Sequence, residues 1–281
     1  MNFKLTHIPK RPEKPRENGL TMVMDKGLSL RQAEDLIESS GDNIDLLKLG
    51  FGTSYVTKNL AEKIQLYKQA NMLVYPGGTL FEAFVARKKF TEFKKFLDMY
   101  DLDICEVSDG SIVLDHSEKC DFIAQLCEDR TVLSEVGSKE QGILISPGKW
   151  IKMMQKELQA GSWKVIAEGR ESGSVGIFRP NGTPHTILIN KIIAKVDAEK
   201  ILWEAPEKKQ QVWFINLFGA NVNLGNIAPH DVIPLECLRL GLRGDTFFNY
   251  LPDKIVDDLQ NQEGEMAKIR KEKQEKKPKL S

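Results

Sequence analysis

The chain lacks the features of secreted, membrane-spanning and strongly charged proteins. Its 281 residues include only four cysteines, none in a CxxC pair, which argues against a disulfide framework. No stretch approaches the roughly 18 uninterrupted apolar residues that a membrane span needs. The 40 Lys and Arg residues balance the 40 Asp and Glu residues, so no net field attracts the chain to nucleic acid or to an anionic membrane. Residues 1–18 contain no apolar segment of a secretory signal, and we therefore expect a cytoplasmic protein with reduced cysteines.

The sequence also lacks the short motifs of common catalytic and nucleotide-binding sites. It contains no GxGxxG fingerprint, P-loop, HExxH or GxSxG segment, and Gly50-Phe51-Gly52 is too short to count as the first of these. Its four histidines are scattered without the spacing of metal ligands. Any chemistry is therefore expected from carboxylates, lysines and arginine.

What the chain does have is a regular alternation of short apolar runs and amphipathic helical stretches. Residues of the AVILMFWYC set make up 41% of it, enough for a sizeable core. Eight runs have the length and composition of buried parallel strands, namely 20–24, 45–49, 72–75, 103–107, 132–136, 164–167, 201–203 and 221–224. Helical spacing lies between them, for example over 30–38, 60–69, 93–100 and 151–158. Ser29 and Pro147 are placed to begin two of these helices.

The number and spacing of the runs indicate the architecture. Eight strands within residues 20–224 give about 26 residues per strand–helix unit, which is typical of a (β/α)8 barrel. The competing open, doubly wound sheet usually has fewer strands and often begins with GxGxxG. We therefore predict an α/β protein with a single (β/α)8 TIM barrel over residues 19–260. The proline-rich and basic residues 1–18 are expected to form an extended arm, and residues 261–281 a charged tail.

Polar residues follow each expected strand. In a (β/α)8 barrel the carboxyl ends of the strands converge on one mouth, where such enzymes carry out their chemistry. Carboxylates together with lysines suit Mg²⁺ and a phosphate-bearing substrate, and nearby glycines let backbone N–H groups approach an anion. The pattern predicts a metal-assisted site for a small, multiply anionic substrate. The residues concerned are Asp25, Lys26, Lys48, Glu106, Asp109, Glu135, Lys139, Glu168, Arg170, Glu204, Asn223, Gly225 and Asn226.

A purely structural interpretation is open for each of these residues taken alone. A single glutamate at a strand end can form an ion pair with a neighbouring lysine and do nothing else. Eight consecutive polar strand ends are harder to explain in this way, and the set as a whole favours a functional site.

Six segments stand out as longer motifs, namely residues 24–27, 48–54, 75–82, 106–111, 168–173 and 241–247. Together they resemble phosphosulfolactate synthase. The resemblance extends from about Gly19 to Phe247 and leaves only the two ends of the chain outside it. Because these motifs occur in the right order, the likeness is specific, although any one of them alone would be weak.

This resemblance implies a (β/α)8 enzyme that uses Mg²⁺ to add sulfite to phosphoenolpyruvate, giving (2R)-phospho-3-sulfolactate on a route to coenzyme M or to sulfolactate. It implies that Lys139, which follows a Glu-Val-Gly segment, donates the proton. The residue before it is Ser138, where family members often carry a second lysine. The family's barrels assemble, so we expect a homo-oligomer, and the apolar residues Trp213, Phe214 and Leu217 are candidates for its interface.

Within that mechanism the strand-end residues receive provisional roles. Glu106, Glu135 and Glu168 are the expected metal ligands. Asp25, Asp109 and Glu204 are alternative metal ligands, or else residues that contact the ligands. Lys26, Lys48 and Arg170 are assigned to the phosphate, carboxylate and sulfite groups, and Asn223, Gly225 and Asn226 to phosphate binding after the eighth strand.

Two other functions stay open from the sequence. The segment 11–16 resembles the N-terminal part of a plant heat-stress-associated protein of the same superfamily, and this keeps a non-enzymatic role in view. The basic residues of the C-terminal tail could bind RNA, with an affinity that falls as salt rises and is lost on truncation after Gln260. A solvated tail is the simpler interpretation, because its charges are mixed in sign and not blocked.

Overall fold

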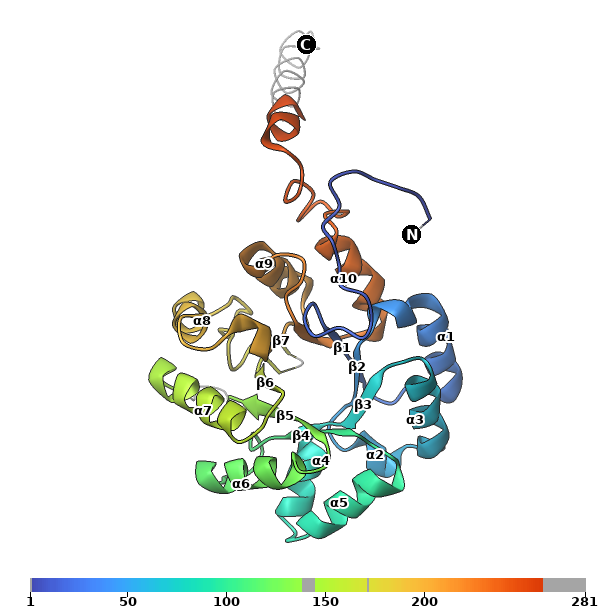
Figure 1. The fold of residues 1–281 in the computed structure, drawn as a ribbon, viewed down its shortest axis with the longest axis vertical. Coiled ribbons are helices and arrows are strands. Elements are labelled where there is room, and N and C mark those ends of the chain that lie inside the picture. Colours follow the sequence, from blue (N-terminus) through green and yellow to red (C-terminus); the bar gives the residue numbers. More distant parts are fainter. Residues whose placement is uncertain (1, 138–144, 171, 260–281) are drawn as a thin grey trace, which may run out of the picture.

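The computed structural model describes residues 2–137, 145–170 and 172–259. Its eight strands are parallel and lie in the order β3-β2-β1-β8-β7-β6-β5-β4. The two end strands of this ladder lie next to each other, so the sheet curls into a nearly closed barrel (Figure 1). The predicted (β/α)8 architecture is therefore confirmed. The strands are β1 (Thr21–Asp25), β2 (Leu46–Leu49), β3 (Leu73–Pro76), β4 (Ile104–Val107), β5 (Thr131–Val136), β6 (Lys164–Ala167), β7 (Ile201–Glu204) and β8 (Leu224–Ile227).

Helices surround the strands and cover the outer face of the sheet (Figure 1). They are α1 (Leu30–Ser40), α2 (Thr53–Val56), α3 (Leu60–Gln69), α4 (Gly78–Val85), α5 (Phe90–Met99), α6 (His116–Leu126), α7 (Pro147–Gln159), α8 (Thr186–Ile193), α9 (Lys208–Phe218) and α10 (Val232–Arg239). Short 3-10 turns occupy Gly41–Asn43, Ala198–Lys200 and Pro229–Asp231. None of the described helices is long and apolar enough to cross a bilayer.

The expected helix starts at Ser29 and Pro147 are confirmed. The Ser29 hydroxyl accepts from the backbone N–H of Gln32 at 3.2 Å, and the Gln32 side chain accepts from the Ser29 N–H at 2.9 Å, which makes a capping box for α1. Pro147 occupies the first turn of α7, where its missing N–H costs nothing.

The eighth strand begins three residues later than predicted. The sequence pattern favoured 221–224, but β8 spans Leu224–Ile227. Gly225 lies within this strand, where a Cβ would come 2.7 Å from the Cε of Met22, so the absence of a side chain makes room for Met22. Asn223 therefore precedes β8 and lies at the amino-terminal end of the barrel, where it accepts from the Leu20 N–H at 3.1 Å. This corrects its assignment to the mouth.

Side chains alternate between the two faces of the barrel wall, as the two-residue period of a strand requires. One core cluster lies between the sheet and the helices and includes Val23, Leu47 and Val165. A second cluster fills the barrel interior and consists of Leu20, Met22, Leu46, Tyr75, Ile104, Leu133, Ile166 and Leu202. On several strands the next inward-facing residue, two positions further on, therefore lies above this apolar floor, toward the mouth.

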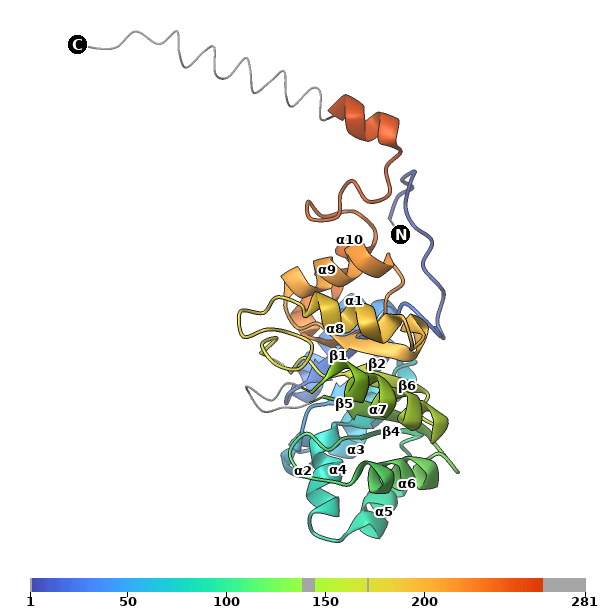
Figure 2. The ribbon, with the colours of Figure 1, turned by 90° about the vertical axis from the view of Figure 1, so that its left-hand side faces the viewer.

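The N-terminal arm passes along the amino-terminal end of the barrel and is anchored by basic side chains (Figure 2). Arg11 pairs with Glu236 of α10 at 3.0 Å, and Arg16 pairs with Asp45 at 2.9 Å. The expectation that Phe214 lies at an oligomer interface is wrong, because this side chain is fully buried. Its ring stacks on that of Trp203, with 5.1 Å between the ring centroids. Leu217 is 41% exposed. Residues 261–281 lie outside the described part of the chain.

Arg239 holds together several loops at the amino-terminal end. It is fully buried on α10 and donates to the carbonyls of Ala220 at 2.6 Å, Val222 at 2.7 Å and Leu20 at 3.1 Å. It thereby ties the approach to β8 to the residue before β1.

Replacing Arg239 with methionine is expected to lower the free energy of unfolding by about 3 kcal/mol, because three hydrogen bonds from a buried guanidinium are lost. The Val222 carbonyl loses its donor, whereas the carbonyls of Ala220 and Leu20 keep Arg11 and the Leu224 N–H as donors. Urea denaturation followed by circular dichroism measures this change. Arg243→Met is the control, since Arg243 is partly exposed and should change stability by no more than about 0.5 kcal/mol. A loss below about 1 kcal/mol in Arg239→Met would show that these carbonyls find other donors.

Candidate active site

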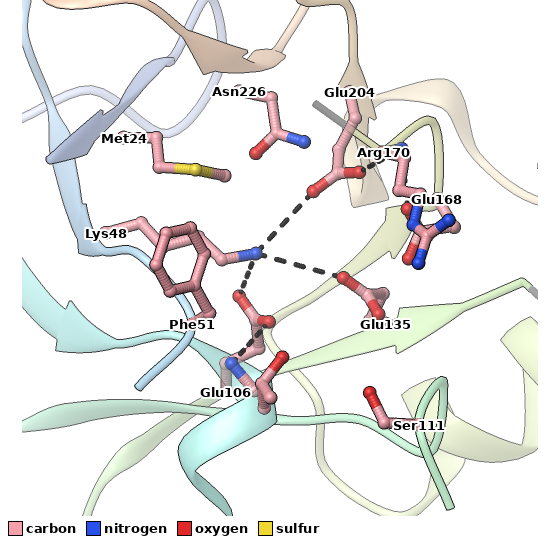
Figure 3. A pocket seen from close by; sticks show the side chains of 12 residues that line it. Met24, Lys48, Phe51, Glu106, Ser111, Glu135, Glu168, Arg170, Glu204 and Asn226 are labelled. Carbon is pink, nitrogen blue, oxygen red and sulfur yellow. Dashed lines mark hydrogen bonds and ion pairs between the residues drawn. The ribbon is translucent and has the colours of Figure 1, made fainter. Parts of the chain in front are cut away.

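The layer above the apolar floor of the barrel is charged. Lys48, Glu106, Glu135 and Glu204 each lie two residues after an inward-facing apolar residue of the same strand, and Glu168 does so directly after β6. All five are 5% exposed or less. They line a cavity of about 230 Å³ at the carboxyl end of the strands, together with Met24, Phe51, Gly78, Thr79, Ser111, Arg170 and Asn226 (Figure 3).

Lys48 lies at the centre of this layer. Its Nζ is 2.9 Å from Glu106 Oε2, 3.6 Å from Glu204 Oε1 and 3.8 Å from Glu135 Oε2 (Figure 3). Burial acts to lower the pKa of the Lys48 ammonium, but the carboxylates of Glu106, Glu204 and Glu135 outweigh it and hold that pKa well above its ordinary value. Lys48 is therefore a fixed positive charge at neutral pH.

Three of the carboxylates gather closely enough to share one cation. Oxygen atoms of Glu135, Glu168 and Glu204 all lie within 4.8 Å of one another. Carboxylate oxygens are the ligands that Mg²⁺ prefers, so the donor set fits this ion. The grouping differs from the expected one, because Glu204 takes the place of Glu106. Glu106 instead pairs with Lys48, and its other oxygen accepts from the Gly78 N–H at 2.8 Å at the start of α4.

Glu135, Glu168 and Glu204 are called the carboxylate triad below. Backbone N–H groups hold two of its members, Glu168 and Glu204. Glu204 accepts from the N–H groups of Gly169 at 2.9 Å and Arg170 at 3.1 Å, and Glu168 accepts from the Arg170 N–H at 2.6 Å. Arg170 has a φ of 52°, a left-handed conformation that non-glycine residues rarely adopt. This strained backbone aims one N–H at both carboxylates, and sequence reasoning, which considered only the guanidinium, missed it.

Two glycines pack against Glu168, and a third packs against Glu204. Gly176 has a φ of 66°, and a Cβ there would lie 1.9 Å from the Glu168 carbonyl oxygen. A Cβ at Gly137 would lie 2.3 Å from the Cβ of Glu168, and one at Gly169 would lie 2.7 Å from the Glu204 carbonyl. The position of the Glu168 side chain thus depends on a backbone packed too tightly for any larger residue.

Gly176→Ala is expected to lower kcat/KM by about 100-fold, because the added methyl must displace Glu168 and a shift near 1 Å is enough for such a loss. Gly148→Ala is the matched control, since a Cβ at Gly148 meets no atom within 4 Å. Steady-state kinetics test both variants, with circular dichroism to confirm the fold. Equal kcat/KM values for the two variants would contradict the role given to Gly176.

The loop after β4 is held by Glu82, a residue to which the sequence pattern gave no role. Glu82 of α4 accepts from the N–H groups of Gly110 at 3.0 Å and Ser111 at 2.8 Å, and from the Ser108 hydroxyl. The loop so fixed carries Ser111 to the cavity wall. The sequence did contain a signal for this role, namely a single glutamate within the otherwise apolar run 80–85. The structure shows that this glutamate is buried.

Several other expected site residues lie away from the cavity. Asp25 is buried between α1 and α3, where it pairs with Lys63 at 2.8 Å and accepts from the Tyr67 hydroxyl at 3.0 Å. Lys26 is exposed and lines a separate depression beside Lys63. Asp109 pairs with Lys119 at 2.9 Å.

The three remaining residues are placed differently from one another. Gly225 faces the barrel interior beneath the mouth, beside Met22. Asn226 lines the cavity, has a φ of 56°, and its buried Oδ1 has no hydrogen-bond partner among the described residues. Lys139 lies outside the described residues.

Comparison with known proteins gives this site a context. Residues 9–245 match the family model of (2R)-phospho-3-sulfolactate synthase (ComA). The chain belongs to the phosphosulfolactate synthase family. The family resemblance seen in the sequence is thereby confirmed, and with it the prediction of an enzyme with a lyase-type addition reaction.

Individual relatives of the family match over nearly their whole length. A phosphosulfolactate synthase of Bacillus subtilis is 41% identical over 251 residues, covering 88% of this chain and 100% of the relative. One of Methanothermobacter thermautotrophicus is 39% identical over 244 residues, covering 85% and 95%. Among solved structures, 3-hexulose-6-phosphate synthase of Salmonella typhimurium aligns with a TM-score of 0.54 at 12% identity, over 80% of this chain and 100% of that one. At that identity the likeness shows the fold alone.

Proposed function

We propose that this protein catalyses the Mg²⁺-dependent addition of sulfite to C3 of phosphoenolpyruvate, giving (2R)-phospho-3-sulfolactate. Membership of the phosphosulfolactate synthase family supports this reaction. The observation that carries it within the structure is the carboxylate triad next to the fixed charge of Lys48, enclosed at the mouth of the barrel.

The lining of the cavity supports a divalent cation. Among the described residues that line it are four glutamates beside the cationic side chains of Lys48 and Arg170. Such an oxygen-rich lining suits a hard divalent cation, which can join carboxylates to the oxygens of an anionic substrate. Glu135, Glu168 and Glu204 are the residues that would hold this cation. When bound, Mg²⁺ supplies Lewis-acid stabilisation of negative charge on the substrate.

The cations of the cavity are suited to bind and orient the anionic groups. Lys48 presents a charge fixed by Glu106 from within the barrel. The guanidinium of Arg170 can grip a phosphate or sulfite oxygen pair in a bidentate manner from the rim. Met24 and Phe51 form an apolar wall beside Lys48 (Figure 3), which limits water around the reacting carbons.

The reaction needs one bond to form, one to break and one proton. The sulfur lone pair of sulfite forms a bond to C3, the C2–C3 π bond breaks, and its electrons move to C2 and the adjacent carboxylate. A proton delivered to one face of C2 then sets the R configuration. We assign that proton to Lys139, because it follows the triad residue Glu135 by four positions and matches the family's proton-donating lysine.

Incubation of the full-length protein with phosphoenolpyruvate, sulfite and Mg²⁺, read by mass spectrometry, tests the proposal. Phosphosulfolactate is expected with Mg²⁺, and its formation should stop with EDTA and resume when excess Mg²⁺ is restored. Absence of product from folded protein in the presence of Mg²⁺ would contradict the proposed reaction and favour another role for this barrel.

Arg170→Lys is expected to raise the KM for phosphoenolpyruvate by about tenfold, because lysine keeps the charge but cannot reproduce a bidentate contact worth about 1.4 kcal/mol. Steady-state kinetics at saturating sulfite measure this change. The backbone N–H of residue 170 should still serve Glu168 and Glu204, so the affinity for Mg²⁺ is expected to stay within about twofold of wild type. An unchanged KM would show that only the backbone of Arg170 acts in the site.

A further inference from the structure

A buried cluster of charged groups lies behind the carboxylate triad, on the outer side of β5. Lys119 of α6 is fully buried, and its Nζ lies 2.9 Å from Glu157 Oε1 of α7 and 2.9 Å from Asp109 Oδ1 of the loop after β4. The same ammonium donates to the backbone carbonyl of Glu135 at 2.5 Å. His116 Nε2 lies 3.1 Å from the Glu157 carboxylate. The described residues that line the cavity do not include Lys119, Glu157, Asp109 or His116.

The three contacts of Lys119 join the elements that carry one side of the active site. Glu135 is a member of the carboxylate triad, and its carbonyl is held by Lys119 while its side chain faces the cavity. Asp109 belongs to the loop that carries Ser111 to the cavity wall. Glu157 fixes the ammonium from α7. One side chain therefore sets the relative positions of the ends of β4 and β5.

Stability alone does not explain a lysine at this place. A buried ion pair is often no more stabilising than apolar side chains of the same volume, because the loss of hydration offsets the attraction. Its three N–H groups do give direction, since each of them points at a different partner: one carbonyl and two carboxylates. Burial acts to lower the pKa of Lys119, but Glu157 and Asp109 outweigh it and raise that pKa, so the contacts persist at neutral pH.

We propose that Lys119 is a positioning residue for the divalent-cation site: by holding the Glu135 carbonyl and the Asp109 loop, it sets the carboxylate of Glu135 for binding the cation. This inference rests on the proposed function. Residues that orient metal ligands typically change metal affinity by 10–100-fold when they are removed.

The chain offers a matched control in Lys63. Lys63 is also a buried lysine on a helix, 2% exposed on α3, and it also reaches a carboxylate and a backbone carbonyl. It pairs with Asp25 at 2.8 Å and donates to the Leu28 carbonyl at 2.9 Å. Its partners lie at the end of β1, away from the triad. The general cost of losing a buried lysine is therefore shared by both residues, and the effect on the triad is not.

Titration of the full-length protein with Mn²⁺, followed by the electron paramagnetic resonance signal of the free ion, tests the proposal without substrate. Lys119→Met is expected to raise the Kd for Mn²⁺ by at least about tenfold, while Lys63→Met stays within about twofold of wild type. The kinetic counterpart is a rise in the Mg²⁺ concentration for half-maximal activity, with kcat at saturating Mg²⁺ reduced less than threefold, on the order of 0.6 kcal/mol.

If Lys119→Met does not fold, Glu157→Gln replaces it, because this variant keeps the size of the side chain and removes the negative charge that holds the ammonium from α7. A Kd raised by at least about threefold in Glu157→Gln then supports the proposal. A Kd within twofold of wild type in the folded Lys119→Met or Glu157→Gln variant overturns it, as does an equal rise in Lys63→Met. Failure of the wild-type protein to bind Mn²⁺ contradicts the proposed metal-dependent function as well.

Discussion

Lys139→Ala is expected to lower kcat by about 10²–10⁴-fold, because the intermediate formed by sulfite addition loses the group that protonates C2. A general acid acts after the substrates are bound, so the KM values and the affinity for Mg²⁺ should change little. Steady-state kinetics with Mn²⁺ binding measured in parallel separate the two effects. This pattern would distinguish a proton donor from a residue that binds the substrate.

The control for this variant is Lys149→Ala. Lys149 is an exposed lysine in the first turn of α7, ten residues further along the chain, and does not line the cavity. Its removal should leave kcat within about twofold of wild type. Lys139→Ala with kcat within a few fold of wild type would contradict the assignment of Lys139 and require another donor. A large rise in KM with unchanged kcat would instead make Lys139 an anion-binding residue.

Glu204→Gln and Glu168→Gln are expected to lower kcat/KM by about 10³-fold at a fixed, low Mg²⁺ concentration. Each change removes one charged oxygen from the carboxylate triad, and metal stabilisation of charge worth about 4 kcal/mol corresponds to that factor. Part of the lost activity should return as Mg²⁺ is raised, because the defect is in binding the ion.

Glu106→Gln gives the comparison that separates the two possible ligand sets. The sequence pattern placed Glu106 among the metal ligands, whereas the structure pairs it with Lys48 and the Gly78 N–H and places Glu204 in the triad. Glu106→Gln is therefore expected to lose activity through Lys48, with a Kd for Mn²⁺ within about threefold of wild type. A Kd raised as strongly as in Glu204→Gln would restore Glu106 to the ligand set.

The sequence predicted the barrel and the layer of the site because both follow from local periodicity. Leu133 and Glu135, or Leu202 and Glu204, are two residues apart on one strand, so an apolar residue in the barrel interior implies that the following carboxylate faces the mouth. The polar residues at the strand ends that face inward do lie together around the cavity, as this rule requires. Asp25 is the last residue of β1 and Asp109 follows β4, but their carboxylates pair with Lys63 and Lys119 outside the cavity.

The sequence could not predict which side chains from different strands pair with one another across the barrel. Lys48 lies closer to Glu106 than to Glu204 or Glu135, and this preference depends on the distances between strands and not on spacing along the chain. The predicted bounds of β8 were wrong, and Gly225 lies in the strand, where its lack of a side chain makes room for Met22 of β1, a contact between strands that local spacing does not show. The backbone N–H of Arg170 and the loop contacts of Glu82 likewise depend on conformations that no local pattern specifies.

Glu135, Glu168 and Glu204 are proposed to form a divalent-cation site together at the mouth of the barrel. The most direct test is anomalous X-ray diffraction from crystals of the full-length protein grown with Mn²⁺. We expect one strong anomalous peak in contact with carboxylate oxygens of all three residues, and loss of that peak in Glu168→Gln. A peak coordinated elsewhere, or none between these residues at saturating Mn²⁺, would contradict it.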